Sequence, residues 1–382
     1  MKPFRAAVAA IALATSAARA DGPQATASAT VERHFTTNAL DGPIALDDWY
    51  TLLRGTAEAL WTGESGLLKV GLEAQAKRYD TYDFEDDHQL ALTVVGTAKI
   101  GDRVELRGTL TGAHAQEGDD LMIDGLLLST RTRKSIVGAA VEAGVDLDEG
   151  RTLVLAVSAR HERTGPTLLA DQLELQLDPD VTTLATSASF SHRQGALTRS
   201  VTASVKSVDP APIEGVIVAV PAVEFSLSGE LRRTLSADAE IAVALGLARL
   251  RSDGFGDEAR PIYALSLKAP VGPLRVRAGL RAFYEYADTD DPLASFLQRA
   301  EVEAALPVTD RVTLGAGAFA QLKDNLLLGF DERSWGIYAE VGFAASSRLT
   351  LVFRTEWDRK RYTVDGLAWS TLDSFVRLKA AL

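Results

Sequence analysis

The sequence predicts an all-β chain that closes into an antiparallel transmembrane β-barrel of about 16 strands. Most of the chain alternates apolar and polar residues with a period of two, which is typical of strands with one apolar face and one polar face. The chain begins with a segment typical of secreted proteins. No later segment approaches the roughly 20 consecutive apolar residues that a transmembrane helix needs.

The secretion signal comprises residues 1–20. Lys2 and Arg5 precede the apolar run 6–15, and Ala18-Arg19-Ala20 forms an A-x-A cleavage site. The apolar run is too short to span a bilayer as a helix. We therefore expect the mature chain to begin at Asp21.

Composition excludes two classes of protein. The chain has no cysteine, so it gains no stability from disulfides after secretion. Removing Lys2, Arg5 and Arg19 from the 40 basic residues leaves 37 against 52 acidic ones, a net charge of −15. We expect no binding to nucleic acid, because such binding requires a basic surface.

Residues 21–66 are predicted to form a short periplasmic segment that contains one helix. Asp47 or Asp48 is a suitable N-cap. The apolar residues that follow recur at helical spacing: Trp49, Leu52, Leu53, Ala57, Leu60 and Trp61. We expect this helix to pack at the barrel mouth, with partner binding or gating as the alternative.

The barrel is predicted over residues 67–382. Alternating segments occupy 70–76, 90–100, 104–110, 137–145, 153–159, 181–193, 196–208, 216–232, 241–247, 263–269, 274–280, 300–306, 312–322, 349–357 and 372–382. Pro221 interrupts one of them and predicts a bulge or a break in pairing. A soluble β-sandwich also uses alternating strands. However, the length of the repeat and the charges on its polar face favour a barrel with a wet interior.

The connections alternate between short and long. Short turns are expected at 101–103, 148–150, 270–273, 308–311 and 346–348, and long, mostly acidic loops at 79–87, 116–133, 163–180, 251–260, 287–296 and 324–334. Short periplasmic turns and long outer loops are typical of outer-membrane barrels. An outward aromatic girdle is expected near the long loops, formed by Tyr263, Tyr284, Tyr286, Trp335 and Trp357.

The signal sequence, the strand repeat and the last strand resemble those of the bacterial outer-membrane β-barrels of the porin-like class. The last strand alternates over 372–382 and ends at Leu382, where the class usually has an aromatic residue. The resemblance implies location in the outer membrane of a Gram-negative bacterium, with its lipids and lipopolysaccharide around the barrel. It also implies the barrel assembly machinery as a partner, and residues 21–66 are candidates for contact with a periplasmic partner.

The polar face supplies the candidate functional residues, which are expected to line the pore: Arg107, Arg275, Arg277, Arg281, Arg299, Glu301, Glu303, Glu340, Arg354 and Glu356. Pairing hairpins about their turns predicts that Glu340 opposes Arg354, that Arg281 opposes Glu303, and that Lys268 stands beside Arg275. These charges either set up a transverse field across a water-filled pore or form ion pairs that fill a narrow barrel. Residues 163–180 either fold in to constrict the pore or extend a hairpin above the membrane.

The predicted function is passive passage of small polar or charged solutes through a porin-like channel. Two alternatives remain open: an export channel for a cell-surface polymer such as exopolysaccharide, and a lipid-modifying enzyme embedded in the barrel. No motif for a nucleophile, metal or phosphate site is present, so we expect no catalytic residues, no metal and no cofactor. The acidic loops 80–87 and 288–291 are expected to be solvated, with bridging to lipopolysaccharide through divalent ions as a further expectation.

Overall fold

The structure is a computed structural model of the full chain. It describes residues 23–123, 126–148, 150–169, 173–213, 220–254, 256–285, 294–326, 329, 331–363 and 366–381. The predicted signal segment, residues 1–20, lies outside the described residues. No helix of the described part is long and apolar enough to cross a membrane.

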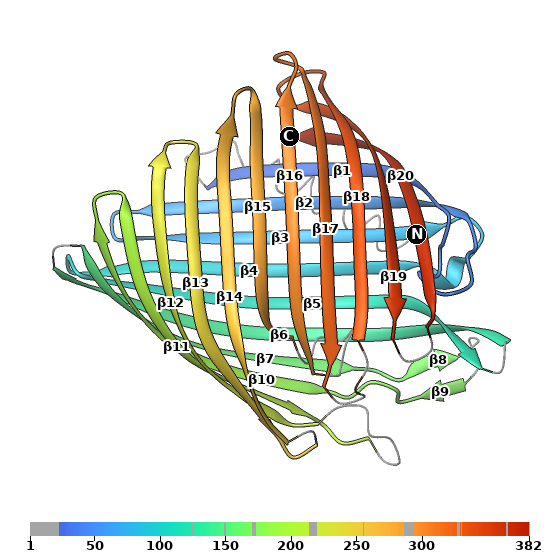
Figure 1. The fold of residues 1–382 in the computed structure, drawn as a ribbon, viewed down its shortest axis with the longest axis horizontal. Helices are drawn as coiled ribbons and strands as arrows, with labels where there is room; N and C mark the ends of the chain where they lie inside the picture. Colours follow the sequence, from blue (N-terminus) through green and yellow to red (C-terminus); the bar gives the residue numbers. More distant parts are fainter. Residues whose placement is uncertain are drawn as a thin grey trace.

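Within the described residues, 18 strands form a closed antiparallel barrel (Figure 1). They are β1 (Gln24–Thr36), β2 (Asp48–Gly63), β3 (Gly66–Tyr79), β4 (Asp87–Ile100), β5 (Val104–Ile123), β6 (Leu126–Asp148), β7 (Arg151–Thr164), β10 (Val181–Gln194), β11 (Leu197–Pro210), β12 (Ala222–Ser236), β13 (Ala239–Ser252), β14 (Gly256–Val271), β15 (Leu274–Glu285), β16 (Ser295–Pro307), β17 (Val312–Asn325), β18 (Asp331–Ala344), β19 (Leu349–Tyr362) and β20 (Ala368–Ala381). The first and last strands pair from Ser28↔Ala381 to Thr36↔Asp373 and close the wall.

The two faces of the wall follow from the register. Cross-strand partners share a face, and the apolar residues form continuous outward rows such as Leu227, Leu247 and Leu245, which are 58%, 57% and 66% exposed. The intervening residues face the lumen. An apolar outer belt around a polar interior is the pattern that lipid on the outside and water on the inside require.

The predicted helix over 49–61 is wrong, because these residues belong to β2, which pairs with both β1 and β3. Inward Leu52 and Leu60 blur the alternation and imitate helical spacing. In β1 the outward residues are mainly alanine and the inward ones mainly serine and threonine, a contrast too weak to recognise. Residues 24–63 are therefore wall and do not form a separate periplasmic segment, and these two strands raise the count from 16 to 18.

The asymmetry of the connections is confirmed. The turns at one end are short, and Gly101, Gly150, Gly195 and Gly272 take positive φ angles there, which glycine adopts without steric cost. The described ends of β1 and β20 lie at this same end, which is the periplasmic end in barrels of this class. The loops at the opposite end are mostly longer, and we call that end the loop end.

Three details of the loop end differ from the expectation. The segment 116–133 is mostly a hairpin extension, because β5 and β6 remain paired as far as Ile123↔Leu126. Pro221 precedes β12 and does not interrupt it. Within 163–180, β8 (Thr167–Leu169) pairs with β6, and β9 (Leu173–Leu175) pairs with β8. These two short strands extend the wall, so the described part of this segment follows the hairpin alternative and not the constriction.

The aromatic girdle is partly as expected. Trp335 is 45% exposed on the outer face, and its ring packs edge-on against Trp357 at 4.6 Å. Tyr263 has outward register, and its hydroxyl donates to Gln298 Oε1 at 3.0 Å. Tyr284 is buried, so its assignment to the girdle is wrong, and Tyr286 lies outside the described residues. Trp49, missed from the sequence, is outward and 46% exposed at the loop end.

Adjacent residues of β14 test the orientation of the wall. Leu265 is outward, whereas Ser266 is inward and exposed to the lumen. We expect Leu265→Arg to lower the free energy of unfolding by about 2–4 kcal/mol, because it places a guanidinium in hydrocarbon. Ser266→Arg should cost much less. Urea titration of the barrel in lipid vesicles measures both, and equal losses would contradict this orientation.

Candidate functional site

The inner face of the barrel is chemically divided. Along β10–β13 its side chains are mainly serine, threonine and alanine, as in Ser187, Ser204 and Ala244. Along β15, β16, β18 and β19 it carries a concentration of arginine and glutamate among smaller residues. The lumen therefore has one small, hydroxyl-bearing side and one strongly charged side.

The register places all ten predicted residues on the inward face. Arg107 lies on β5, Arg275, Arg277 and Arg281 on β15, Arg299, Glu301 and Glu303 on β16, Glu340 on β18, and Arg354 and Glu356 on β19. Nine of them lie on β15–β19, and Arg107 lies apart. That they line an open pore remains a prediction.

The predicted pairings are correct in one case of three. Glu340 opposes Arg354, with 3.9 Å between the nearest charged atoms. Arg281 faces Arg299, whereas Glu303 faces Arg277. Lys268 stands opposite Arg277 and not opposite Arg275. The Arg281 error arises because the register between β15 and β16 depends on the loop that joins them, whose geometry the sequence does not reveal. Lys268 is displaced because β14 and β15 stay paired as far as Val271↔Leu274, a tighter turn than the expected 270–273.

Arg354 is one of the inward arginines that other side chains hold in place. It forms an ion pair with Glu356 at 2.6 Å, and its guanidinium lies over the Tyr338 ring at 3.7 Å. Arg299 similarly pairs with Glu301 at 3.0 Å and lies over the Phe319 ring. Ion pairs and ring contacts of this kind hold the charged groups in defined positions along the wall.

Four other inward cations form a stripe with no ion pair among the described residues: Lys268, Arg275, Arg277 and Arg281. Lys268 stands directly opposite Arg277, so like charges are neighbours within this stripe. Such neighbours repel each other, and a bound anion would relieve the repulsion. We call these four residues the cationic stripe.

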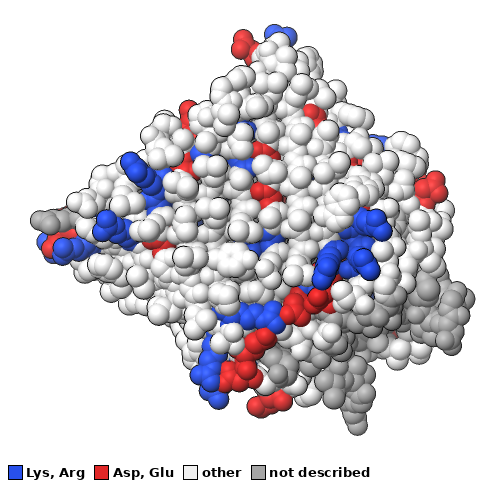
Figure 2. Space-filling view, viewed as in Figure 1, with Lys and Arg blue, Asp and Glu red and all other residues white. Residues whose placement is uncertain are grey.

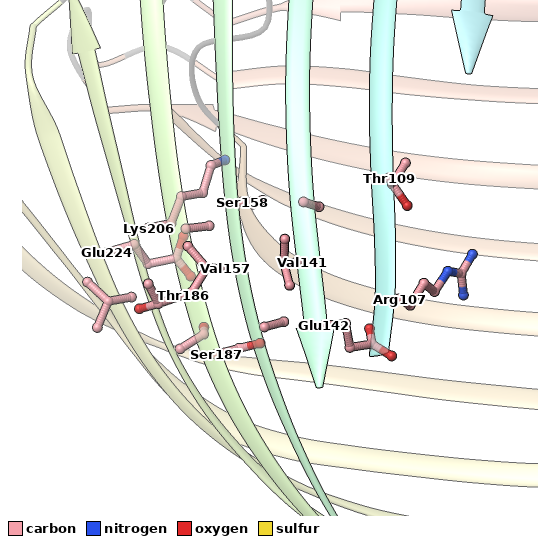
Figure 3. A pocket seen from close by; sticks show the side chains of 15 residues that line it. Arg107, Thr109, Val141, Glu142, Val157, Ser158, Thr186, Ser187, Lys206 and Glu224 are labelled. Carbon is pink, nitrogen blue, oxygen red and sulfur yellow. The ribbon is translucent and has the colours of Figure 1, made fainter. Parts of the chain in front are cut away.

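Arg107 belongs to a hollow of the inner wall on β5–β12 (Figure 3). Small residues such as Ala140 and Ala156 leave the space, which Arg107 and Glu142 flank on one side and Lys206 and Glu224 on the other. The hydroxyls of Ser158 and Ser187 also line it. The hollow thus offers hydroxyl groups between two sets of opposite charges.

The wall is folded on itself at the loop end. Pairing of β13 with β14 continues to Ser252↔Gly256, but pairing of β14 with β15 ends at Tyr263↔Ala282. The loop ends of β14 and β15 therefore separate. Residues 294–297 at the start of β16 are buried on both faces, which shows that other parts of the chain cover both sides there.

The contacts show which layer lies inside. Tyr284 and Phe296 belong to the outward register, yet they pack in one cluster with Leu250 and Val208, which belong to the inward register of their strands. These faces can meet only if the loop ends of β15 and β16 lie on the lumenal side of β10–β14. We call this part of β15 and β16 the tucked hairpin.

Arg260 joins the two layers. Its guanidinium pairs with Asp324 of β17 and with Glu258 of β14, each at 2.6 Å, and lies over the Phe296 ring at 4.8 Å. Tyr284 donates its hydroxyl to the carbonyl of Glu258 at 3.4 Å. The tucked hairpin is thus held against the lumenal side of the wall by polar as well as apolar contacts.

A second polar cluster, missed from the sequence, crosses the seam between β20, β1 and β2. Glu32 and His34 are 2% and 5% exposed. His34 contacts Glu32 Oε2 through Nε2 at 2.9 Å and Asp373 Oδ1 through Nδ1 at 2.8 Å. Carboxylates only accept hydrogen bonds, so both ring nitrogens donate and the imidazolium carries a charge. The sequence signal for this cluster was that Glu32 and His34 are two residues apart, so they share one face if this segment is a strand.

The seam cluster has three further members. Tyr50 donates its hydroxyl to Asp373 Oδ2 at 2.8 Å, and its ring stacks on His34 with 4.3 Å between centroids. Arg377 donates to Glu32 Oε1 at 2.8 Å, and the Phe375 ring covers the other face of His34. The cluster bonds side chains of the first, second and last strands to one another.

Two aspartates of the acidic loop 80–87 form ion pairs with arginines. Arg33 bonds Asp80, which lowers the pKa of that carboxyl, and Arg78 pairs with Asp86 at 2.5 Å. Asp87 accepts from the amide of Gly118. Among the described residues, no group of three or more histidine, aspartate or glutamate side chains is placed to hold a metal ion. The loop 288–291 lies outside the described residues.

Comparison with known proteins gives a fold but no family. No family model matches the sequence, and no curated protein matches it. Among solved structures, OccK2 (OpdF) of Pseudomonas aeruginosa is similar with a TM-score of 0.52 at 14% identity, covering 94% of this chain and 98% of that one. The copper transporter OprC is similar with a TM-score of 0.54 at 9% identity, covering 94% and 81%. Identities this low carry the architecture alone.

The closed barrel, the apolar outer belt and the polar lumen place this chain in one structural class. It has the architecture of an outer-membrane β-barrel and resembles the porin-like class, and it is located in the outer membrane of a Gram-negative bacterium.

Arg260 tests the role of the tucked hairpin. We expect Arg260→Gln to raise single-channel conductance and open-channel noise, because the hairpin loses its bridge to the wall while Glu258 and Asp324 remain as unneutralised carboxylates. Arg249→Gln removes an exposed arginine, paired with Asp257 on the outer face, and serves as the control. Unchanged conductance in Arg260→Gln would show that the bridge does not hold the hairpin.

The seam cluster is expected to stabilise barrel closure. Replacing His34 by alanine leaves the buried Glu32 without one of its partners, and we expect a loss of about 3–5 kcal/mol. The temperature at which the folded barrel loses its compact mobility in detergent gels should fall. His114→Ala is the control, because His114 is exposed on the outer face with a single hydroxyl partner. Equal effects of the two variants would contradict the role of the cluster.

Proposed function

We propose that this barrel is a water-filled channel for the passive passage of small polar or charged solutes, with a preference for anions. The observation that carries the proposal is the cationic stripe, where Lys268, Arg275, Arg277 and Arg281 face the lumen without ion pairs among the described residues. Unpaired guanidinium groups bind carboxylate and phosphate oxygens in bidentate geometry.

The opposite wall carries charges of both signs. Glu105 and Glu142 face the lumen from β5 and β6, opposite Lys99 and Arg107, and form no ion pair among the described residues. Figure 1 shows β14–β16 at the front of the barrel and β3–β6 behind them. Unpaired cations gathered on one wall create a transverse field, which orients a dipolar solute as it passes. The tucked hairpin limits the size of that solute.

One of the similar solved structures supports an anionic substrate. OccK2 (OpdF) of Pseudomonas aeruginosa has been solved in complex with glucuronate, a carboxylate sugar, and this structure has a TM-score of 0.50 at 14% identity. Polymer export and lipid modification are the alternative functions, and no cluster or contact that we find among the described residues favours either of them over a channel.

Ion selectivity in planar bilayers tests the proposal. We expect wild-type protein to form stable open channels whose reversal potential in a salt gradient indicates anion preference. The triple variant R275Q/R277Q/R281Q should lower the ratio of anion to cation permeability several-fold while the channels stay open. The control R33Q/R78Q/R249Q removes the same charge from the outer face. Absence of conductance in wild-type protein would overturn the channel, and unchanged selectivity in the triple variant would overturn the anion preference.

A further inference from the structure

Three arginines gather on the outer face at the loop end of β18 and β19. Arg333 and Arg361 stand directly opposite each other in the register, and Arg359 stands opposite Trp335. All three side chains are exposed. Figure 2 shows Lys and Arg side chains gathered over the lower ends of these strands. We call Arg333, Arg359 and Arg361 the outer arginine patch.

The patch is an unfavourable arrangement in the chain alone. Like charges directly opposite each other on one face of a sheet repel. The nearest carboxylate is Asp331, whose oxygen lies 3.8 Å from Arg333. Arg359 and Arg361 form no ion pair among the described residues. One distant carboxylate does not neutralise three guanidinium groups.

Three other outward arginines at the same end are arranged differently. Arg33 bonds Asp80 through both terminal nitrogens, Arg78 pairs with Asp86 at 2.5 Å, and Arg249 pairs with Asp257. Each of these arginines has an aspartate of its own. Among the described residues, the outer arginine patch has only the 3.8 Å contact between Arg333 and Asp331, so a counter-charge from outside the chain would stabilise it.

The position of the patch identifies the source of that charge. It lies at the edge of the apolar belt, next to Trp335 and Trp357, which mark the interface between hydrocarbon and headgroups. Ile337 and Phe353, further along the same strands, are 53% and 51% exposed on the lipid side. This position favours an anion attached to a lipid whose acyl chains lie along Ile337 and Phe353.

We propose that the outer arginine patch binds the phosphate group of an outer-leaflet glycolipid. Arg359 and Arg361 grip the phosphate oxygens, since a guanidinium matches them in bidentate geometry, and Arg333 adds a third positive charge. Trp335 and Trp357 support the sugar and the first part of the acyl chains. The site lies outside the lumen and is independent of the proposed channel.

Native mass spectrometry of the full chain in detergent tests this site, with diphosphoryl lipid A as the probe. We expect wild-type protein to retain one lipid. R359Q/R361Q should bind it about 30-fold more weakly, because each arginine near a charged lipid surface strengthens binding by a similar factor and the variant loses two of them. The matched control R33Q/R78Q removes the same charge from paired positions and should retain the lipid. R359K/R361K keeps the charge without the planar fork and should bind with intermediate strength.

Two further probes separate the sources of phosphate. Lipid A stripped of both phosphates should bind weakly to wild-type protein, as weakly as diphosphoryl lipid A binds to R359Q/R361Q. Millimolar inorganic phosphate should not displace diphosphoryl lipid A from wild-type protein. Displacement by inorganic phosphate would show a general anion site and overturn the assignment to a lipid. The site itself would be overturned if wild type and R359Q/R361Q retained diphosphoryl lipid A equally. It would also be overturned if wild type retained the dephosphorylated lipid as well as diphosphoryl lipid A.

Discussion

Pairing between the first and last strands is the constraint on which the rest of the structure depends. A strand edge exposed in hydrocarbon leaves amide and carbonyl groups without partners, at a cost of several kcal/mol for each group. β1 and β20 remove this cost by pairing from Ser28↔Ala381 to Thr36↔Asp373. On the outer side this seam pairs small residues such as Ala29 and larger apolar ones such as Val31 and Leu378. On the inner side Glu32, His34 and Asp373 reinforce it with charged hydrogen bonds.

Once the wall is closed, its two faces have different freedom. The outer face needs only apolar side chains of moderate size, and interfacial residues where lipid headgroups begin. The inner face contacts water, so each position can carry a charge, a hydroxyl or a small side chain. This freedom allows one barrel to combine a charged side on β15–β19, a hydroxyl side on β10–β13, and an apolar cluster around Leu250 where the wall doubles.

How much the sequence predicts depends on how far each feature extends along the chain. Period-two alternation identifies β17 and β19, because leucine and phenylalanine contrast with charged neighbours. It fails for β1, where alanine alternates with serine and threonine. All ten candidate lumenal residues are inward because facing depends on local alternation alone. The seam cluster joins His34 to a residue 339 positions away, and the tucked hairpin reverses the facing of Tyr284 and Phe296, so neither is visible in a local pattern.

The tucked hairpin also sets the shape that the protein presents to the bilayer. At the periplasmic end every strand contributes to the circumference. At the loop end the outward faces of β15 and β16 are covered by β13 and β14, so lipid meets fewer strands there. The perimeter of the wall is therefore shorter at the loop end than at the periplasmic end. A barrel of this tapered form presents a narrower cross-section to the cell surface than to the periplasm.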